Sequence, residues 1–177
     1  SRSSNHPPRE LPHKLQSASL QHSYLGPSYE KEISQLVQGL EDSSEYRITE
    51  CSAIEKAVAP LIAHGEIVLW FQGRMEFGPR ALGARSILAL PNSISIKDKL
   101  NLYLKKRCWY QPFCPSILED DAQDLLCNLK GTPNRFMTCA YRVKQDRLHQ
   151  LQGVMNIDGT CRPQIVPRDN SSPYSRL

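Results

Sequence analysis

An apolar stretch, Ile67–Phe71, opens directly into a segment, residues 73–86, that carries three glycines and three arginines. A short apolar run of this kind predicts a buried strand, and the glycines predict tight turns after it. Glycine lets backbone N–H groups approach a ligand closely, while arginine supplies a forked, permanently charged donor that matches phosphate oxygens. We therefore expect an Arg-rich loop at the end of a strand, and this loop is a candidate phosphate-binding element.

The positive charge of the chain is concentrated in and after this loop. Residues 73–107 hold eight Lys and Arg against two acidic residues, although the whole chain of 177 residues has a formal net charge of only +4. A local positive field attracts an anion, either a phosphorylated small molecule or a nucleic acid. The basic residues include Arg74, Arg80 and Arg85 of the loop and the triplet 105–107. The triplet also suits the negative end of a helix dipole.

Helices and strands alternate along the chain. Apolar residues at helical spacing, or a capping pattern, predict helices over residues 33–40, 52–65, 94–107 and 119–127. Apolar or extended runs predict strands over residues 46–49, 67–71, 86–90, 136–143 and 161–166. Ser52 and Glu55 are placed as a capping box for the second helix. The alternation indicates an α/β or α+β domain.

Other features narrow the setting of the protein. Residues 1–21 are rich in Ser, Pro, His and Gln, and we expect a disordered tail or linker there. No apolar run reaches the length of a membrane span, and the N-terminus lacks the pattern of a secretory signal. The six cysteines show no CxxC spacing, which favours free thiols in the reducing cytoplasm and argues against a zinc site. The absence of an initiator Met is consistent with an excised, processed or partial chain.

Three sequence blocks carry a resemblance to a known family. In chain order they are GRMEFGPRALGARSILALP, KKRCWYQPFCPSIL and DGTCRPQIV. They resemble the C-terminal domain of the O-carbamoyltransferases of the nodulation and antibiotic-tailoring type, over Tyr24 to Leu177. The resemblance implies a YrdC-like fold, in which a twisted mixed sheet with flanking helices presents a concave positive surface. We expect this domain over residues 22–177, incomplete at its C-terminus.

The resemblance also implies a reaction. In complete enzymes of the family, the YrdC-like domain is thought to bind carbamoyl phosphate and ATP with Mg²⁺ and to form carbamoyl-adenylate. An actin-like N-terminal domain, which holds a metal, then transfers the carbamoyl group to an acceptor hydroxyl. The present sequence lacks that domain, so we expect it as a partner and expect no metal site in this chain.

Four basic residues match anion-contacting positions of the family. Arg80 lies in the Phe-Gly-Pro-Arg element, and Lys105 and Arg107 match its Lys-x-Arg pair, with Lys106 as a solvated neighbour. Arg162 follows the Asp-Gly-Thr turn, where it could instead simply pair with Asp158. Arg74 and Arg85 are additional candidates from the same loop as Arg80. Positioned Arg and Lys side chains lower the repulsion between two phosphate-bearing reactants.

The sequence departs from the family pattern at several places. Gln111 stands where the family has an arginine, and Asn156 stands where it has a histidine. Ala84 and Leu90 replace more usual polar residues. The chain also lacks an Asn-Thr-Ser-Phe-Asn element that follows in the family and helps to complete the nucleotide site. These departures put complete catalysis by this chain in doubt.

Three alternatives therefore stay open beside an intact carbamoyl-activating domain. A concave basic surface also suits an RNA backbone, although the basic residues lie in tight loops and not along an open face. The chain could be a non-catalytic remnant, or one half of a split enzyme. The aromatic residues Trp109, Tyr110 and Phe113 are expected in the core more than as a platform for adenine.

Overall fold

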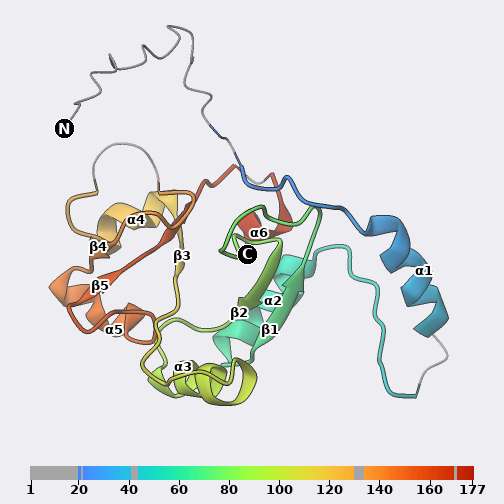
Figure 1. Cartoon of the computed structure of the whole chain (residues 1–177), viewed down its shortest axis with the longest axis horizontal. Coiled ribbons are helices and arrows are strands. Elements are labelled where there is room, and N and C mark those ends of the chain that lie inside the picture. The colour runs from blue at the N-terminus through green and yellow to red at the C-terminus, as the bar shows by residue number, and fades with distance from the viewer. Residues whose placement is uncertain (1–19, 21, 41–43, 130–133, 170) are drawn as a thin grey trace, which may run out of the picture.

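The structure is a computed structural model that describes residues 20, 22–40, 44–129, 134–169 and 171–177. The helices are α1 (Glu30–Leu40), α2 (Ile54–Ala63), α3 (Ile94–Lys99), α4 (Glu119–Leu125), α5 (Leu148–Leu151) and α6 (Pro173–Arg176) (Figure 1). A π-helical turn, η1 (Leu100–Leu104), follows α3, and a 3-10 turn, η2 (Gln145–Arg147), precedes α5. The strands are β1 (Val68–Phe71), β2 (Arg85–Leu88), β3 (Ser116–Leu118), β4 (Tyr141–Arg142), β5 (Thr160–Cys161) and β6 (Gln164–Val166). The expected α+β class is confirmed, whereas the tail predicted over residues 1–21 lies almost entirely outside the described residues.

The strands pair in three small sheets within the described residues, and not in one continuous twisted sheet. β1 and β2 form an antiparallel hairpin in which Trp70 lies opposite Ser86. β3 and β6 run parallel with Ile117 opposite Ile165, and β4 pairs antiparallel with β5. In Figure 1, β3 runs between the β1–β2 hairpin and the group formed by α4, β4, β5 and α5. The parallel pair thus brings residues 116–118 beside residues 164–166, which are far apart in the second half of the chain.

The main hydrophobic core lies in this second half. Its buried members are Ile117, Ala122, Leu126, Val143, Leu151, Val154, Cys161 and Ile165. They come from β3, α4, α5 and the strands that pair with them, so that each short element buries one apolar side against the others. Removal of this apolar surface from water is the main term that stabilises so small a set of strands.

The β1–β2 hairpin is less buried than its sequence suggests. The strand predicted at 67–71 is present, but only Trp70 is buried, while Leu69 is 73% exposed and Phe71 is 51% exposed. Successive side chains of a strand point to opposite faces, and on the face that holds Leu69 and Phe71 the Arg85 guanidinium lies over the Phe71 ring while both residues stay exposed. The expectation of a fully buried strand is therefore wrong.

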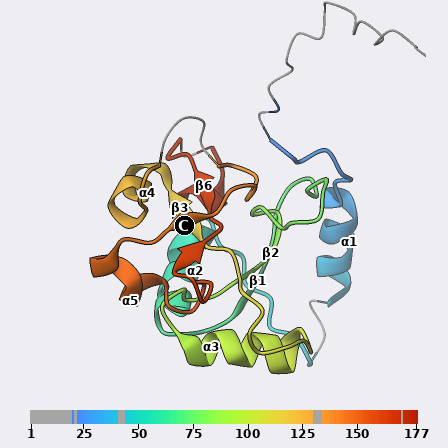
Figure 2. The ribbon, with the colours of Figure 1, turned by 60° about the vertical axis from the view of Figure 1, so that its left-hand side comes forward.

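Helix α1 stands apart from the rest of the described chain in both views (Figures 1 and 2). The spacing of its apolar residues predicted the helix correctly. None of its residues is buried, and Leu36 on the apolar stripe is 61% exposed. The helix therefore does not contribute to the core that positions the site.

Two predictions just before and within α2 are wrong. Residues 46–49 form exposed coil, because no described segment pairs with them as a strand. Helix α2 begins one residue later than expected, with Ala53 as its N-cap and no side-chain cap. Glu55 does not close a capping box but forms an ion pair with Arg176 at 3.0 Å. A partner far along the chain has replaced the local one.

The helix predicted over residues 94–107 is shorter and changes its winding. After α3 ends, the turn η1 closes with a hydrogen bond from the Lys105 N–H to the Leu100 carbonyl at 2.8 Å. The wider π turn rotates the side chains that follow. Leu100 is buried as expected, but Tyr103, placed on the same face by sequence, is 76% exposed. The polar side chain of Asn101 is buried in its stead.

Two further expectations differ from the structure. The strand predicted over residues 136–143 is confined to β4, since turns and bends occupy 135–139 and Met137 has a positive φ of 53°. Trp109 and Tyr110 were expected in the core but are 60% and 61% exposed. Phe113 is partly buried against the core as expected.

Candidate anion-binding site

Five of the six candidate basic residues line one cavity of about 580 Å³. They come from three segments far apart in the sequence, and they are Arg80, Arg85, Lys105, Arg107 and Arg162. Among the described residues, Lys97 also lines this cavity and no Asp or Glu does. Strand β2, helix α3 and the segment 112–118 supply most of its apolar wall. Lys97 forms an ion pair with Asp98 at 3.3 Å, whereas no ion pair is formed by the other five basic residues with a described side chain. An excess of basic groups makes a site suited to an anion.

The Arg-rich loop is folded around a buried carboxylate. Glu76 is 7% exposed, and its Oε1 accepts hydrogen bonds from the backbone N–H groups of Leu82, Ala84 and Arg85 at 2.7, 2.7 and 3.1 Å. Burial acts to raise the pKa of Glu76, but the backbone donors outweigh it and hold the pKa below its ordinary value of 4.5. Gly83 takes a φ of 104° within the same turn, a conformation that glycine adopts readily. The ionised carboxylate thus sets the shape of the loop.

The two loop arginines that reach the cavity use their guanidinium groups differently. Arg85 lies 3.4 Å from the centre of the Phe71 ring. It also donates to three backbone carbonyls of the hairpin at 2.8 to 3.0 Å, those of Gln72, Gly73 and Ala84. Arg80 donates from Nε to the Met137 carbonyl at 3.3 Å, and its guanidinium makes no other hydrogen bond or ion pair with a described residue. Arg85 therefore mainly holds the loop, whereas the terminal nitrogens of Arg80 are not engaged in holding it.

A tight turn after η1 brings Lys105 and Arg107 into the cavity lining and leaves Lys106 out of it. Lys106 has a positive φ of 48°, and the Arg107 N–H donates back to the Asn101 carbonyl at 2.9 Å. The guanidinium of Arg107 lies 4.4 Å from the centre of the Phe113 ring. The turn lies beyond the end of η1 and directs alternate residues to one side. Lys105 and Arg107 therefore face the cavity together, while Lys106 does not.

Arg162 reaches the cavity from the link between β5 and β6. It does not pair with Asp158, whose carboxylate accepts hydrogen bonds from the N–H and hydroxyl of Thr160. Its Nη2 lies 3.5 Å from Cys114 Sγ, and its Nε is buried without a partner among the described residues. A buried donor left unpaired is costly unless a ligand completes it.

Arg74 is not brought to this cavity. Its guanidinium donates to the carbonyls of Gly26 and Leu25 at 2.8 and 2.9 Å. Its side chain lines a second cavity of about 630 Å³, which shares Tyr174 with the first. The contacts of Arg74 tie the segment before α1 to the Arg-rich loop.

Of the four substituted positions, Leu90 lines the cavity, whereas Ala84, Gln111 and Asn156 lie outside its lining. The Gln111 carbonyl accepts a hydrogen bond from the Asn101 side chain, and Asn156 donates to the Thr160 hydroxyl at 3.0 Å. Both residues hold loops in this structure. Neither side chain adds to or takes from the charge that faces the cavity.

Comparison with known proteins gives this geometry a family. Residues 59–177, more than half of the chain, match the family model described as carbamoyltransferase C-terminus. The chain belongs to this carbamoyltransferase C-terminal family. The matched segment of the carbamoyltransferase C-terminus contains every basic residue that lines the cavity.

Individual relatives agree with this assignment. The chain is 41% identical to an uncharacterized protein of Methanocaldococcus jannaschii, over 89% of this chain and 26% of that protein. It is 38% identical to nodulation protein NolO of Bradyrhizobium diazoefficiens, over 85% of this chain and 28% of that protein. It is 37% identical to nodulation protein NolNO of Sinorhizobium fredii, over 88% of this chain and 23% of that protein. The chain thus spans about a quarter of the length of these relatives.

The sequence analysis did not identify the buried polar and aromatic residues that support the loops around the cavity. Glu76 was visible as the one acidic residue of the Arg-rich loop, and Asn101 as a polar residue inside an apolar helical stretch. Asn134, which is buried and donates to the carbonyls of Cys139 and Pro163, follows no pattern that sequence alone would reveal. Neither does Tyr174, which packs beside Gly83 and lines both cavities.

The described part of the chain contains no group of three or more His, Cys, Asp or Glu side chains placed to hold a metal ion. It also contains no helix with the length and apolar character needed to cross a membrane.

Proposed function

We propose that the cavity binds carbamoyl phosphate and ATP. Water releases phosphate from carbamoyl phosphate, and the resulting carbamate attacks the α-phosphorus of ATP to give carbamoyl-adenylate and pyrophosphate. The observation that carries this proposal is the convergence of basic side chains from three distant segments on one cavity whose lining includes no Asp or Glu among the described residues. Two phosphate-bearing reactants repel each other, and charge develops on the leaving pyrophosphate. Fixed guanidinium and ammonium groups lower both costs without covalent chemistry by the protein.

The individual side chains support distinct roles. Arg80 and Arg107 keep terminal nitrogens that suit bidentate contacts to phosphate oxygens. Lys105 supplies a compact charge beside them, and Arg162 lines the same cavity. No Asp or Glu side chain lines the cavity among the described residues, so Mg²⁺ that accompanies the nucleotide would take ligands from phosphate and water.

The wider reaction follows from the family. In the proposal, carbamoyl-adenylate passes to an actin-like domain, on the same or another chain, for transfer to an acceptor hydroxyl. The six cysteines are unpaired in the structure, which supports a reducing compartment such as the cytoplasm.

A calorimetric titration of the chain with carbamoyl phosphate, with and without ATP and Mg²⁺, tests the proposal. We expect saturable binding that Arg80→Ala removes. Arg168→Ala is the matched control, because Arg168 lies outside the cavity lining and pairs with Asp120 at 2.8 Å. Loss of binding in both variants would indicate a general charge effect and not a specific site.

The remaining outcomes separate the rival functions. A folded chain that binds neither ligand would be a remnant, or half of a split enzyme that needs its partner. Tight binding of a single-stranded RNA oligonucleotide, with steep salt dependence and no preference for carbamoyl phosphate, would favour a nucleic-acid surface.

A further inference from the structure

We infer that Asn101 is a positioning residue for the anion site, because its buried side chain holds Arg107 so that both terminal guanidinium nitrogens are left for a ligand. The inference rests on the proposed function in one respect: it takes the ligand of the cavity to carry a phosphate group. The hydrogen bond between Arg107 and Asn101 does not depend on any ligand.

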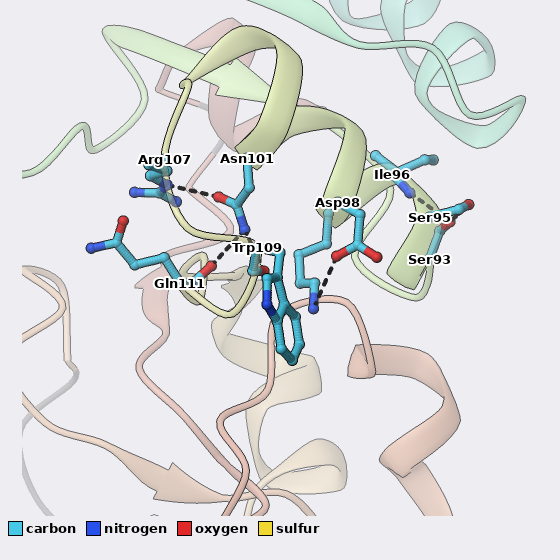
Figure 3. Close-up of polar contacts among 9 residues, drawn as sticks. Ser93, Ser95, Ile96, Asp98, Asn101, Arg107, Trp109 and Gln111 are labelled. Carbon is cyan, nitrogen blue, oxygen red and sulfur yellow. Dashed lines mark hydrogen bonds and ion pairs between the residues drawn. The ribbon is translucent and has the colours of Figure 1, made fainter.

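The amide of Asn101 uses all of its donors. The side chain is fully buried, and its Nδ2 donates to the carbonyls of Trp109 and Gln111, both at 2.9 Å (Figure 3). Because both N–H bonds point to carbonyls, the oxygen end of the amide must face the other way. That oxygen, Oδ1, accepts a hydrogen bond from Arg107 Nε at 2.7 Å. The short distance is typical of a bond to a charged donor.

These contacts leave Arg107 with one face and one edge engaged. The Phe113 ring covers the face at 4.4 Å, and Asn101 takes the Nε–H. Among the described residues, neither terminal nitrogen of Arg107 has a hydrogen-bond partner. A guanidinium held in this way presents a rigid pair of N–H donors whose spacing matches two phosphate oxygens. Less freedom is lost when the ligand binds, so its affinity rises.

The π-helical turn explains why a polar residue is buried at this position. The wider winding of η1 turns Asn101 toward the loop 107–111. The Asn101 carbonyl also accepts the Arg107 backbone N–H at 2.9 Å, so the arginine is held at two points. A purely structural role would account for the two bonds from Nδ2 to the loop. It would not account for the bond from Oδ1 to a side chain in the cavity lining.

A double-mutant cycle on phosphate affinity separates positioning from folding. The four proteins are the unmodified chain, Asn101→Ala, Arg107→Ala and the double variant, each titrated with inorganic phosphate by calorimetry. We expect Asn101→Ala to weaken phosphate binding about tenfold, as removal of an orienting partner commonly does. In the Arg107→Ala background the same change should matter by less than about twofold, since there is no guanidinium left to orient. Equal losses in the two backgrounds would overturn the inference.

Two further variants keep the test decisive. Val143→Ala removes apolar contact in the core, away from the cavity, and controls for a general loss of stability. It should leave phosphate affinity within about twofold. Arg107→Lys keeps the charge but removes the Nε–H, and leaves the bonds of Asn101 to the loop intact. It should bind phosphate about tenfold more weakly, and undiminished affinity would show that the orientation of the Arg107 guanidinium by Asn101 is unimportant.

A readout without any ligand separates this inference from the proposed function. If the unmodified chain binds no phosphate, the proposed function fails. The Arg107 Nε–H resonance in ¹⁵N spectra then decides the positioning. We expect a slowly exchanging signal in the unmodified chain and in Val143→Ala, and its loss in Asn101→Ala. A signal that is absent from the unmodified chain, or unchanged in Asn101→Ala, overturns the inference.

Discussion

Replacement of Glu76 by Gln tests whether one ionised carboxylate holds the Arg-rich loop in shape. The variant keeps the size of the side chain and an oxygen that can accept hydrogen bonds, but it removes the charge. Three backbone N–H groups converge on Glu76 Oε1 at 2.7 to 3.1 Å. Each of them loses the electrostatic part of its bond in Glu76→Gln.

The magnitude follows from the number of donors. A hydrogen bond to a charged group contributes about 1.5–3 kcal/mol, and one between neutral groups about 0.5–1.5 kcal/mol. For three donors the difference is roughly 3 kcal/mol. The neutral amide recovers part of this because it is less costly to bury than a carboxylate. We expect Glu76→Gln to lower the free energy of unfolding by about 2 kcal/mol at neutral pH.

Urea unfolding followed by tryptophan fluorescence measures this difference, since the buried Trp70 lies in the hairpin that carries the loop. The folded-state pKa of Glu76 lies below its ordinary value of 4.5, so the carboxylate stabilises the fold above that pH. Its contribution is lost as the pH falls through the folded-state pKa. The two proteins should therefore become equally stable in acid.

The control for Glu76→Gln is Glu66→Gln, at an exposed position, which should change the free energy of unfolding by less than about 0.5 kcal/mol. A difference between the unmodified chain and Glu76→Gln that stays constant between neutral and acidic pH would refute the reasoning. So would a Glu76→Gln variant as stable as the unmodified chain at neutral pH.

Three other predictions concern packing, loop support and thiol reactivity. Gly83→Ala places a Cβ against the Tyr174 ring at a φ of 104°, and thermal unfolding should show a loss of about 2–4 kcal/mol. An unchanged melting temperature would contradict that packing. Arg85→Ala removes three contacts to backbone carbonyls and the contact with the Phe71 ring, and should lower the free energy of unfolding by about 1–3 kcal/mol in urea. Full stability of that variant would show that the arginine does not hold the hairpin. Burial raises the pKa of the Cys161 thiol to about 12, so iodoacetamide should leave Cys161 unmodified while exposed cysteines react. Mass spectrometry checks this, and early modification of Cys161 would show that the core opens readily.

The elements of the fold were largely predictable from local patterns, and their burial was not. Apolar residues at helical spacing or a capping pattern predicted α1, α2 and α4, and apolar runs predicted the two strands of the β1–β2 hairpin. The exposure of Leu69 and Tyr103 depends on what covers each element and on how a helix winds, and neither is encoded within a window of a few residues. The capping pair at Ser52 and Glu55 failed for the same reason, since Arg176 offers a stronger partner from the other end of the described chain.

The candidate site shows the same division. Spacing alone would have grouped Arg74 with Arg80, because only six positions separate them. In the structure Arg74 lines the second cavity, whereas Arg80 lines the first cavity together with Arg162. The turn around Glu76 determines which side chains face each cavity. Family resemblance, which carries information about long-range contacts, had already pointed to Arg80, Lys105, Arg107 and Arg162. The supporting residues behind them had no such signal.

The pairing of β3 with β6 is expected to complete the cavity late in folding. Ser116 and Gln164, opposite each other in this pair, are separated by 48 positions, whereas β1 and β2 close a much shorter loop. Closing the longer loop costs more chain entropy, so we expect this contact to form late. Arg162, which precedes β6, should then join Arg80 and Lys105 late in folding. An anion that needs all three binds the native chain alone and stabilises the step that forms last, so added phosphate should slow unfolding more than it speeds folding.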